Sequence, residues 1–217
     1  MSKPGDTNGP VFDGTFRGQL ADLMRWRRDV RRFLTDPVDD AALARCISAF
    51  ASAPSVGLSE PWRILRVASD AARRAALLNF TTANEAALAG YAGADAERYA
   101  TLKLSGMREA PVQLAIFCDE ATEKGRGLGA GTMPEMRRYS VVSAITQFWL
   151  AARAEGIGVG WVSILDPDQL SRDLDAPACW RLVGYLCVGY PAEATDTPEL
   201  ERLGWEERAD TLIIEDR

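Results

Sequence analysis

The amino-acid sequence predicts one domain of mixed α+β architecture, in which layers of helices and strands share a single core. At 217 residues and 47% hydrophobic content, the chain is long enough for one well-packed core and short for two. Some segments carry apolar residues at helical spacing, and others carry short apolar runs of strand length. Helices and strands therefore share one layered domain, and no segment repeats.

The first helix is expected in the arginine-rich stretch near the N-terminus. Apolar residues recur there at helical spacing, at Leu20, Leu23, Trp26, Val30 and Phe33. Asp36 and Pro37 fit the start of a second helix that stops before Pro54.

The remaining elements are expected in chain order along residues 53–194. They are a loop at 53–62, a strand at 63–67, a helical segment at 70–108 broken by Gly90 and Gly93, a strand at 112–118, a glycine-rich loop at 125–131, a buried helix at 140–155 with Gly156 as its C-cap, a glycine-rich strand at 156–165, a helix opened by Asp166 and Pro167, and a strand at 181–188.

These elements define the expected organisation of the chain. Residues 1–14 form a flexible N-terminus and residues 15–217 a single domain, with a candidate lid at about 81–108 and a C-terminal extension at 192–217. The extension is long enough to embrace a partner subunit. The N-terminal stretch has no apolar run, so it predicts neither a signal peptide nor a membrane anchor.

Composition excludes several kinds of function. The chain has no histidine, which rules out histidine-based nucleophilic catalysis and histidine-ligated zinc. Its pI near 4.9 argues against a general nucleic-acid binder. The cysteines show no C-x-x-C pair, so we expect no metal site and reduced thiols in or near the core, at Cys46, Cys118, Cys179 and Cys187. A protein of the cytoplasm that contacts neither membrane nor nucleic acid is the default expectation.

Residues 25–33, RWRRDVRRF, place five arginines around one aspartate in a chain of net charge −6. The planar guanidinium fork suits phosphate, so the cluster indicates a phosphorylated small ligand. The alternative is an ordinary solvated helix face, on which Asp29 pairs with Arg25 and Arg32 one turn away. Charge alone leaves both interpretations open.

Four stretches in order resemble the flavin-dependent nitroreductase superfamily. RRDVRRF at 27–33 resembles its phosphate-binding motif, APSVGLSEPW at 53–62 its APS-x-x-N-x-QPW loop, GIGVGWVS at 156–163 its glycine-rich strand beneath the flavin, and VGYP at 188–191 its closing strand. The resemblance implies a three-layer fold with a central mixed sheet and helices on both faces. It also implies an intertwined homodimer with the helix at 140–155 at its centre, and FMN bound between the subunits.

Within the superfamily, the chain resembles the dimethylbenzimidazole synthase branch. Asp29 stands where most nitroreductases have a small hydroxyl residue, and Leu58 and Glu60 stand where they have Asn and Gln. This resemblance implies that reduced FMN is a substrate and O2 a co-substrate. The products would be 5,6-dimethylbenzimidazole, the lower ligand of vitamin B12, and erythrose 4-phosphate. A separate NAD(P)H flavin reductase would supply the reduced FMN.

The resemblance also implies roles for individual residues. Asp29 and Ser163 would be catalytic and contact the flavin, and Gly57 would hold oxygen near the ring with its amide. The implied flavin-binding residues form four groups: Arg27, Arg28, Val30, Arg31 and Arg208 at the phosphate and ribityl chain, Pro54, Ser55, Val56 and Gly57 at the ring, Leu104 in the lid, and Ser163 after the glycine-rich strand.

Asp29 and Ser163 each have a possible structural role in place of a catalytic one, and the motifs are compatible with more than one activity. Asp29 can be a structural partner of arginine, and Ser163 a strand-end hydroxyl that bonds to the backbone. An NAD(P)H-dependent nitroreductase and a flavin carrier without turnover are the other functions compatible with these motifs.

Overall fold

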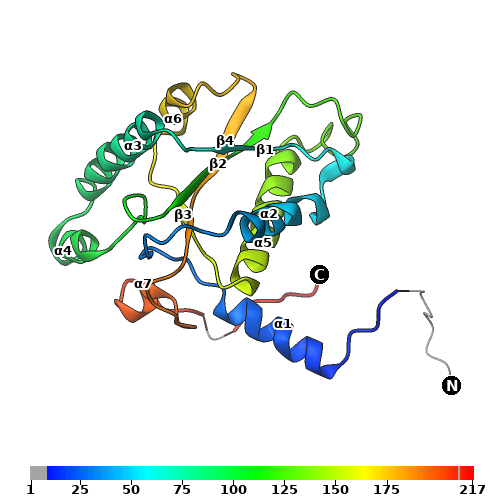
Figure 1. The fold of residues 1–217 in the computed structure, drawn as a ribbon, viewed down its shortest axis with the longest axis horizontal. Helices are drawn as coiled ribbons and strands as arrows, with labels where there is room; N and C mark the ends of the chain where they lie inside the picture. The colour runs from blue at the N-terminus through cyan, green and yellow to red at the C-terminus, as the bar shows by residue number, and fades with distance from the viewer. Residues whose placement is uncertain (1–8, 210) are drawn as a thin grey trace.

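A four-stranded sheet with the order β1-β2-β4-β3 forms the centre of the computed structural model, which describes residues 9–209 and 211–217 (Figure 1). All three strand pairs are antiparallel, and an isolated parallel bridge joins Asp29 to Val159 beside β3. The strands are β1 (Trp62–Arg66), β2 (Val112–Asp119), β3 (Gly158–Val162) and β4 (Trp180–Gly189).

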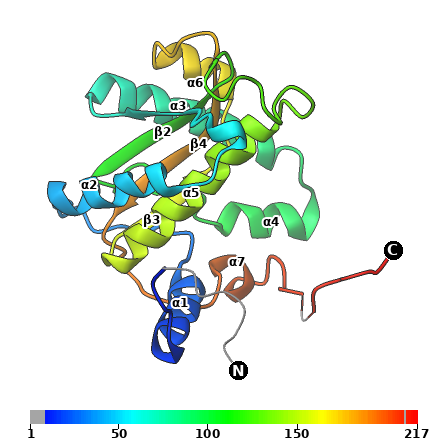
Figure 2. The same ribbon diagram turned by 90° about the vertical axis from the view of Figure 1, so that its right-hand side faces the viewer.

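Helices cover both faces of the sheet, which confirms the predicted three-layer α+β fold (Figures 1 and 2). On one face lie α2 (Asp40–Ser48) and α5 (Met136–Ala154); on the other lie α3 (Asp70–Leu88) and α6 (Pro167–Asp173). Successive side chains of a strand point to opposite faces, so β2 serves both cores. Its Leu114 and Ile116 pack on the α5 side, and Ala115 and Phe117 on the α3 side.

Three further helices lie at the margins of the layers: α1 (Gly14–Trp26), α4 (Gly93–Thr101) and α7 (Glu199–Arg202). Short 3-10 turns at Ala49–Ser52 and Val56–Leu58 follow α2. The predicted break between Gly90 and Gly93 separates α3 from α4, as expected. Among the described helices, none is long and apolar enough to cross a membrane.

The prediction of a first helix running to Phe33 is wrong in its second half. The helix α1 ends at Trp26, and Arg27 adopts an extended conformation. Beyond it the chain runs beside the sheet, where the Val30 amide donates to the Val159 carbonyl oxygen at 3.0 Å and Phe33 bridges to Pro191. These long-range backbone hydrogen bonds replace the helical ones, and the buried Phe33 and the half-buried Val30 pack against the sheet instead of along a helix.

The glycines of β3 also have a different purpose from the one expected. The resemblance implies a strand beneath the flavin, yet a Cβ on Gly160 would lie 2.0 Å from the Val30 carbonyl oxygen, and one on Gly158 would lie 2.9 Å from the Val30 side chain. The space over these glycines is therefore taken by Val30, by its backbone at Gly160 and its side chain at Gly158. This close approach holds the arginine-rich segment against the sheet.

Three smaller expectations also need correction. The second helix begins at Asp40, because the Asp39 side chain, and not Asp36, accepts the capping hydrogen bond from the Ala42 amide at 2.7 Å. The buried helix begins at Met136, before the predicted start at residue 140. Cys179 is exposed, whereas the other three cysteines are buried as expected. The prediction that residues 1–14 are flexible falls mainly on residues 1–8, outside the described part.

Gly160→Ala is expected to destabilise the fold, because its methyl group must displace the Val30 carbonyl. We expect a loss of about 2–3 kcal/mol in the free energy of unfolding, the upper range for overpacking, measured by urea denaturation. Gly18→Ala is the matched control, since nothing lies within 4 Å of its Cβ position in α1. Equal stability of the two variants would show that the close approach of Val30 to Gly160 does not affect the free energy of unfolding.

Candidate functional site

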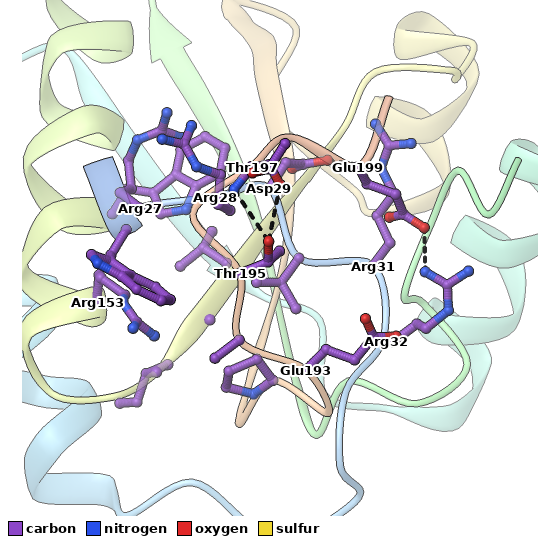
Figure 3. Close-up of a pocket in the computed structure, with 18 of the residues that line it drawn as sticks. Arg27, Arg28, Asp29, Arg31, Arg32, Arg153, Glu193, Thr195, Thr197 and Glu199 are labelled. Carbon is purple, nitrogen blue, oxygen red and sulfur yellow. Dashed lines mark hydrogen bonds and ion pairs between the residues drawn. The ribbon is translucent and has the colours of Figure 1, made fainter. Parts of the chain in front are cut away.

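The arginine pocket lies where residues 26–32, the C-terminal end of α5 and residues 191–202 meet (Figure 3). Its volume is about 50 Å³. Three carboxylates, Asp29, Glu193 and Glu199, face six arginines in its lining: Arg27, Arg28, Arg31, Arg32, Arg153 and Arg202. The arginine-rich stretch singled out in the sequence therefore forms a concave site, and not a solvated helix face.

Asp29 is held in place at both carboxylate oxygens. Its Oδ1 accepts from the Trp161 amide at 2.8 Å, and its Oδ2 accepts from Arg31 Nε at 2.9 Å. Burial raises the pKa of this carboxyl, and the Trp161 hydrogen bond and the nearby Arg31 and Arg27 oppose that shift without cancelling it. The side chain keeps 31% of its surface exposed. Asp29 is thus a fixed, accessible carboxyl with an increased tendency to hold a proton.

Arg28 carries a donor without a partner among the described residues, and Arg208, which does not line the arginine pocket, adds positive charge to its surroundings. Burial and the charges of Arg27 and Arg208 lower the pKa of Arg28, while Asp196 and Glu201 act in the opposite direction. Within the described residues, Arg28 Nε is buried and has no hydrogen-bond partner. A buried donor without a partner is costly, and guanidinium groups attract an anion. This part of the site fits a phosphate group.

Aromatic rings orient two other cations of the arginine pocket. The Arg27 guanidinium lies 4.6 Å from the centre of the Trp149 ring, and that of Arg153 lies 5.7 Å from the centre of the Trp26 ring. Such contacts fix a guanidinium while leaving its edge free to donate. They bind the end of α1 to the C-terminal end of α5.

Sequence reasoning missed Arg32 and the wall formed by residues 193–202. Arg32 forms an ion pair with Glu199, the first residue of α7, whose side chain is only 12% exposed (Figure 3). The arginine-rich motif contained Arg32, but no local signal connects it with a glutamate 167 residues later. The length of the C-terminal extension was the one available indication that this segment serves the site.

The predicted ring-binding residues at 54–57 lie outside the arginine pocket. They are next to the N-terminal end of α5, where the Val56 amide donates to Ser140 Oγ at 3.0 Å. Ser140 and Trp149 are nine residues apart on α5, or about 14 Å at 1.5 Å per residue. Gly57 has a φ of +57°, and the Leu128 carbonyl oxygen would lie 2.8 Å from a Cβ there, so this loop has no room for a side chain at residue 57. The structure therefore places the two predicted halves of the site at opposite ends of one helix.

Two other predicted residues also lie apart from the arginine pocket. Ser163 is exposed directly after β3, two residues beyond the Trp161 amide that binds Asp29. Leu104 lines a second cavity of about 190 Å³, between α3 and residues 102–109. Their contacts with a flavin remain predictions.

Comparison with known proteins shows the family of this chain. The Nitroreductase family model matches residues 24–190. The chain belongs to the nitroreductase family. It is 56% identical over 95% of its length to the 5,6-dimethylbenzimidazole synthase of Rhodospirillum rubrum, covering 98% of that protein. It is 48% identical over 92% of its length to a 5,6-dimethylbenzimidazole synthase of Rhodobacter capsulatus, covering 97% of that protein.

A solved nitroreductase-fold structure supports the same architecture. Iodotyrosine deiodinase bound to FMN and 3-iodo-L-tyrosine superposes with a TM-score of 0.72 at 21% identity, over 91% of this chain and 99% of the other. At this identity the likeness shows the fold alone. The layered scaffold is therefore shared with that structure, whereas the chemistry of the site depends on this chain's own residues.

The raised pKa of Asp29 predicts a specific pH dependence of stability. The folded carboxyl binds its proton more tightly than the unfolded one, whose pKa is near 3.8. The contribution of Asp29 to the free energy of unfolding should therefore fall as the pH rises from about 3.8 through the folded-state pKa. Denaturation curves from pH 4 to 7 should show the wild type losing stability relative to Asp29→Asn as the pH rises. Parallel profiles would contradict the assignment.

Proposed function

We propose that this protein fragments reduced FMN with O2 to form 5,6-dimethylbenzimidazole and erythrose 4-phosphate. The observation that carries the proposal is the 56% identity, over nearly the whole of both chains, to a 5,6-dimethylbenzimidazole synthase. The presence of Asp29 at the arginine pocket supports it, because breaking the flavin requires proton transfers. An NAD(P)H-dependent nitroreductase is the alternative, and a flavin carrier without turnover is the third candidate.

The arginine pocket supplies the binding part of this function. Arg28 and Arg208 would hold the phosphate, where the unpartnered Arg28 Nε becomes a donor to a phosphate oxygen. Arg27, fixed over Trp149, and Arg31 would orient the ribityl chain. FMN, when bound, supplies the ring and the ribityl carbon from which the product is built. A separate NAD(P)H flavin reductase would provide it in the reduced form.

Asp29 is the proposed proton-transfer group. The Trp161 amide and Arg31 hold its carboxyl in one orientation, and burial raises its pKa toward the range useful for acid–base catalysis. Its exposed fraction leaves an oxygen able to exchange a proton with a ligand. Ser163, two residues past Trp161 along the same chain, is proposed to assist that transfer.

We propose that the working site forms between two copies of the chain. A cavity of about 50 Å³ is far smaller than the roughly 300 Å³ or more of ordinary ligand sites. The predicted ring-binding residues lie at the opposite end of α5. Exposed apolar side chains form a stripe on and before α1, and another group lies in the C-terminal tail: Phe12, Phe16, Leu20 and Met24, and Leu212, Ile213 and Ile214. An intertwined dimer would cover these surfaces and complete the site.

The central test mixes the protein with chemically reduced FMN without oxygen and then admits air. Dimethylbenzimidazole, identified by chromatography and mass spectrometry, should form as flavin is lost. Full recovery of oxidised FMN would contradict the proposal. Consumption of NAD(P)H would then identify a nitroreductase, and FMN retained without any consumption would identify a carrier.

Asp29→Asn should retain FMN binding and lose product, because it preserves size and removes the titratable proton. We expect product formation to fall at least about 100-fold, the lower range for removing a general acid or base. FMN binding is measured by fluorescence quenching, and Asp22→Asn on exposed α1 serves as the matched control. A normal product yield from Asp29→Asn would show that the carboxyl is only a structural partner of Arg31.

The dimer proposal predicts complementation between two inactive variants. A chain with Arg28→Ala and Arg208→Ala should lack the phosphate half of the site, and a Gly57→Val chain should lack the ring half. A mixed dimer contains one site with both halves intact and one site with neither. If the subunits exchange statistically, half of the dimers are mixed. Activity should therefore return to about a quarter of the wild-type value. Ultracentrifugation checks the dimer itself. No recovery on mixing would place both halves in one chain.

A further inference from the structure

The C-terminal extension contacts the arginine pocket through a short, well-defined turn. Pro198 precedes α7, and Glu199, its first residue, forms the ion pair with Arg32. The Leu203 amide donates to the Glu199 carbonyl at 3.0 Å, and the Trp205 amide donates to the Leu200 carbonyl at 2.8 Å. These hydrogen bonds make residues 199–205 one compact unit, so a shift at Glu199 also moves Trp205.

The opposite side of this turn contacts the candidate lid. The Trp205 ring centre lies 5.6 Å from that of Tyr91 and 6.1 Å from that of Tyr99, both in edge-on contact. The two tyrosine rings stack at 4.8 Å, and the Tyr99 hydroxyl donates to Asn84 Oδ1 at 2.8 Å. Both views of the fold show α7 next to α4 (Figures 1 and 2).

These aromatic contacts join α4 to the turn at residues 199–205. Tyr99 is the buried residue of α4, and its ring contacts both Tyr91 and Trp205. Aromatic pairs of this geometry contribute beyond the area they bury. The placement of α4 therefore depends on the position of the Trp205 indole.

The chain continues from Trp205 to Arg208, which lies close enough to Arg28 to lower the pKa of that guanidinium. Glu199 and Arg202 of the same extension line the arginine pocket, so a phosphate held there by Arg28 would lie against this turn. The positive charge of Arg208 would then be attracted by that phosphate. The same short segment therefore senses the anion at Arg208 and holds the lid helix at Trp205.

We propose that Trp205 is a positioning residue that couples phosphate binding at Arg28 and Arg208 to the placement of α4. The inference rests on the proposed function for the identity of the anion, the phosphate of FMN. It adds a basis for substrate selection: a flavin that carries a phosphate orders the lid, and a flavin without one leaves it loose. Trp205 itself contacts the lid and not the pocket.

Hydrogen exchange with oxidised FMN and with riboflavin, each at saturating concentration, tests this coupling. In the wild type, FMN should slow the exchange of amides at 91–101 about tenfold more than riboflavin does. In Trp205→Leu that difference should disappear, while FMN still protects residues 27–33. Trp205→Phe keeps an aromatic ring and should restore the difference. Leu203→Ala, in the same turn with an exposed side chain, is the matched control.

Each outcome bears on one proposal or the other. Equal protection of 91–101 by riboflavin and FMN in the wild type, or FMN-specific protection that persists in Trp205→Leu, would overturn the coupling. FMN-specific protection in a wild type that forms no dimethylbenzimidazole would support the coupling and overturn the synthase proposal alone. A wild type that binds no FMN would overturn both.

Discussion

The arrangement of the site depends on one backbone contact, the pairing of residues 29 and 30 with β3. The Val30 amide binds the Val159 carbonyl, and Gly160 leaves room for the Val30 carbonyl that follows. This pairing keeps the segment extended, so Asp29 and Arg31 lie on the same side of the chain and form their ion pair. In a helix, residues two apart do not face each other. The carboxyl geometry is therefore a consequence of a strand-like backbone.

Local patterns predicted most of the fold but not this segment. The apolar run of β2, the apolar stretch of α5 before Gly156 and the glycine break before α4 are each contained within a short stretch of sequence, and each was predicted. Val30 and Phe33 match helical spacing equally well, but hydrogen bonds to partners more than a hundred residues away decide their conformation. No window of local sequence contains those partners, so tertiary pairing overrides the pattern.

The candidate site was predictable to a similar degree. The arginine motif pointed to an anion through the chemistry of its five arginines, and the resemblance singled out Arg27, Arg28, Arg31 and Arg208, whose charge acts on Arg28. Neither source could reveal Glu199 or Trp205, because a glutamate and a tryptophan in a polar tail have many ordinary uses. Their importance comes from position: one contacts the pocket and the other the lid, on a single turn.

The electrostatics of Asp29 connect ligand binding with proton transfer. A carboxylate among arginines ordinarily has a lowered pKa, yet at Asp29 the effect of burial exceeds that of Arg31 and Arg27. A phosphate held by Arg28 would add negative charge to the same pocket and raise the pKa of Asp29 further. Binding of the anion would thus act in the same direction as burial, so the proposed proton-transfer group and the proposed phosphate site are coupled through their charges.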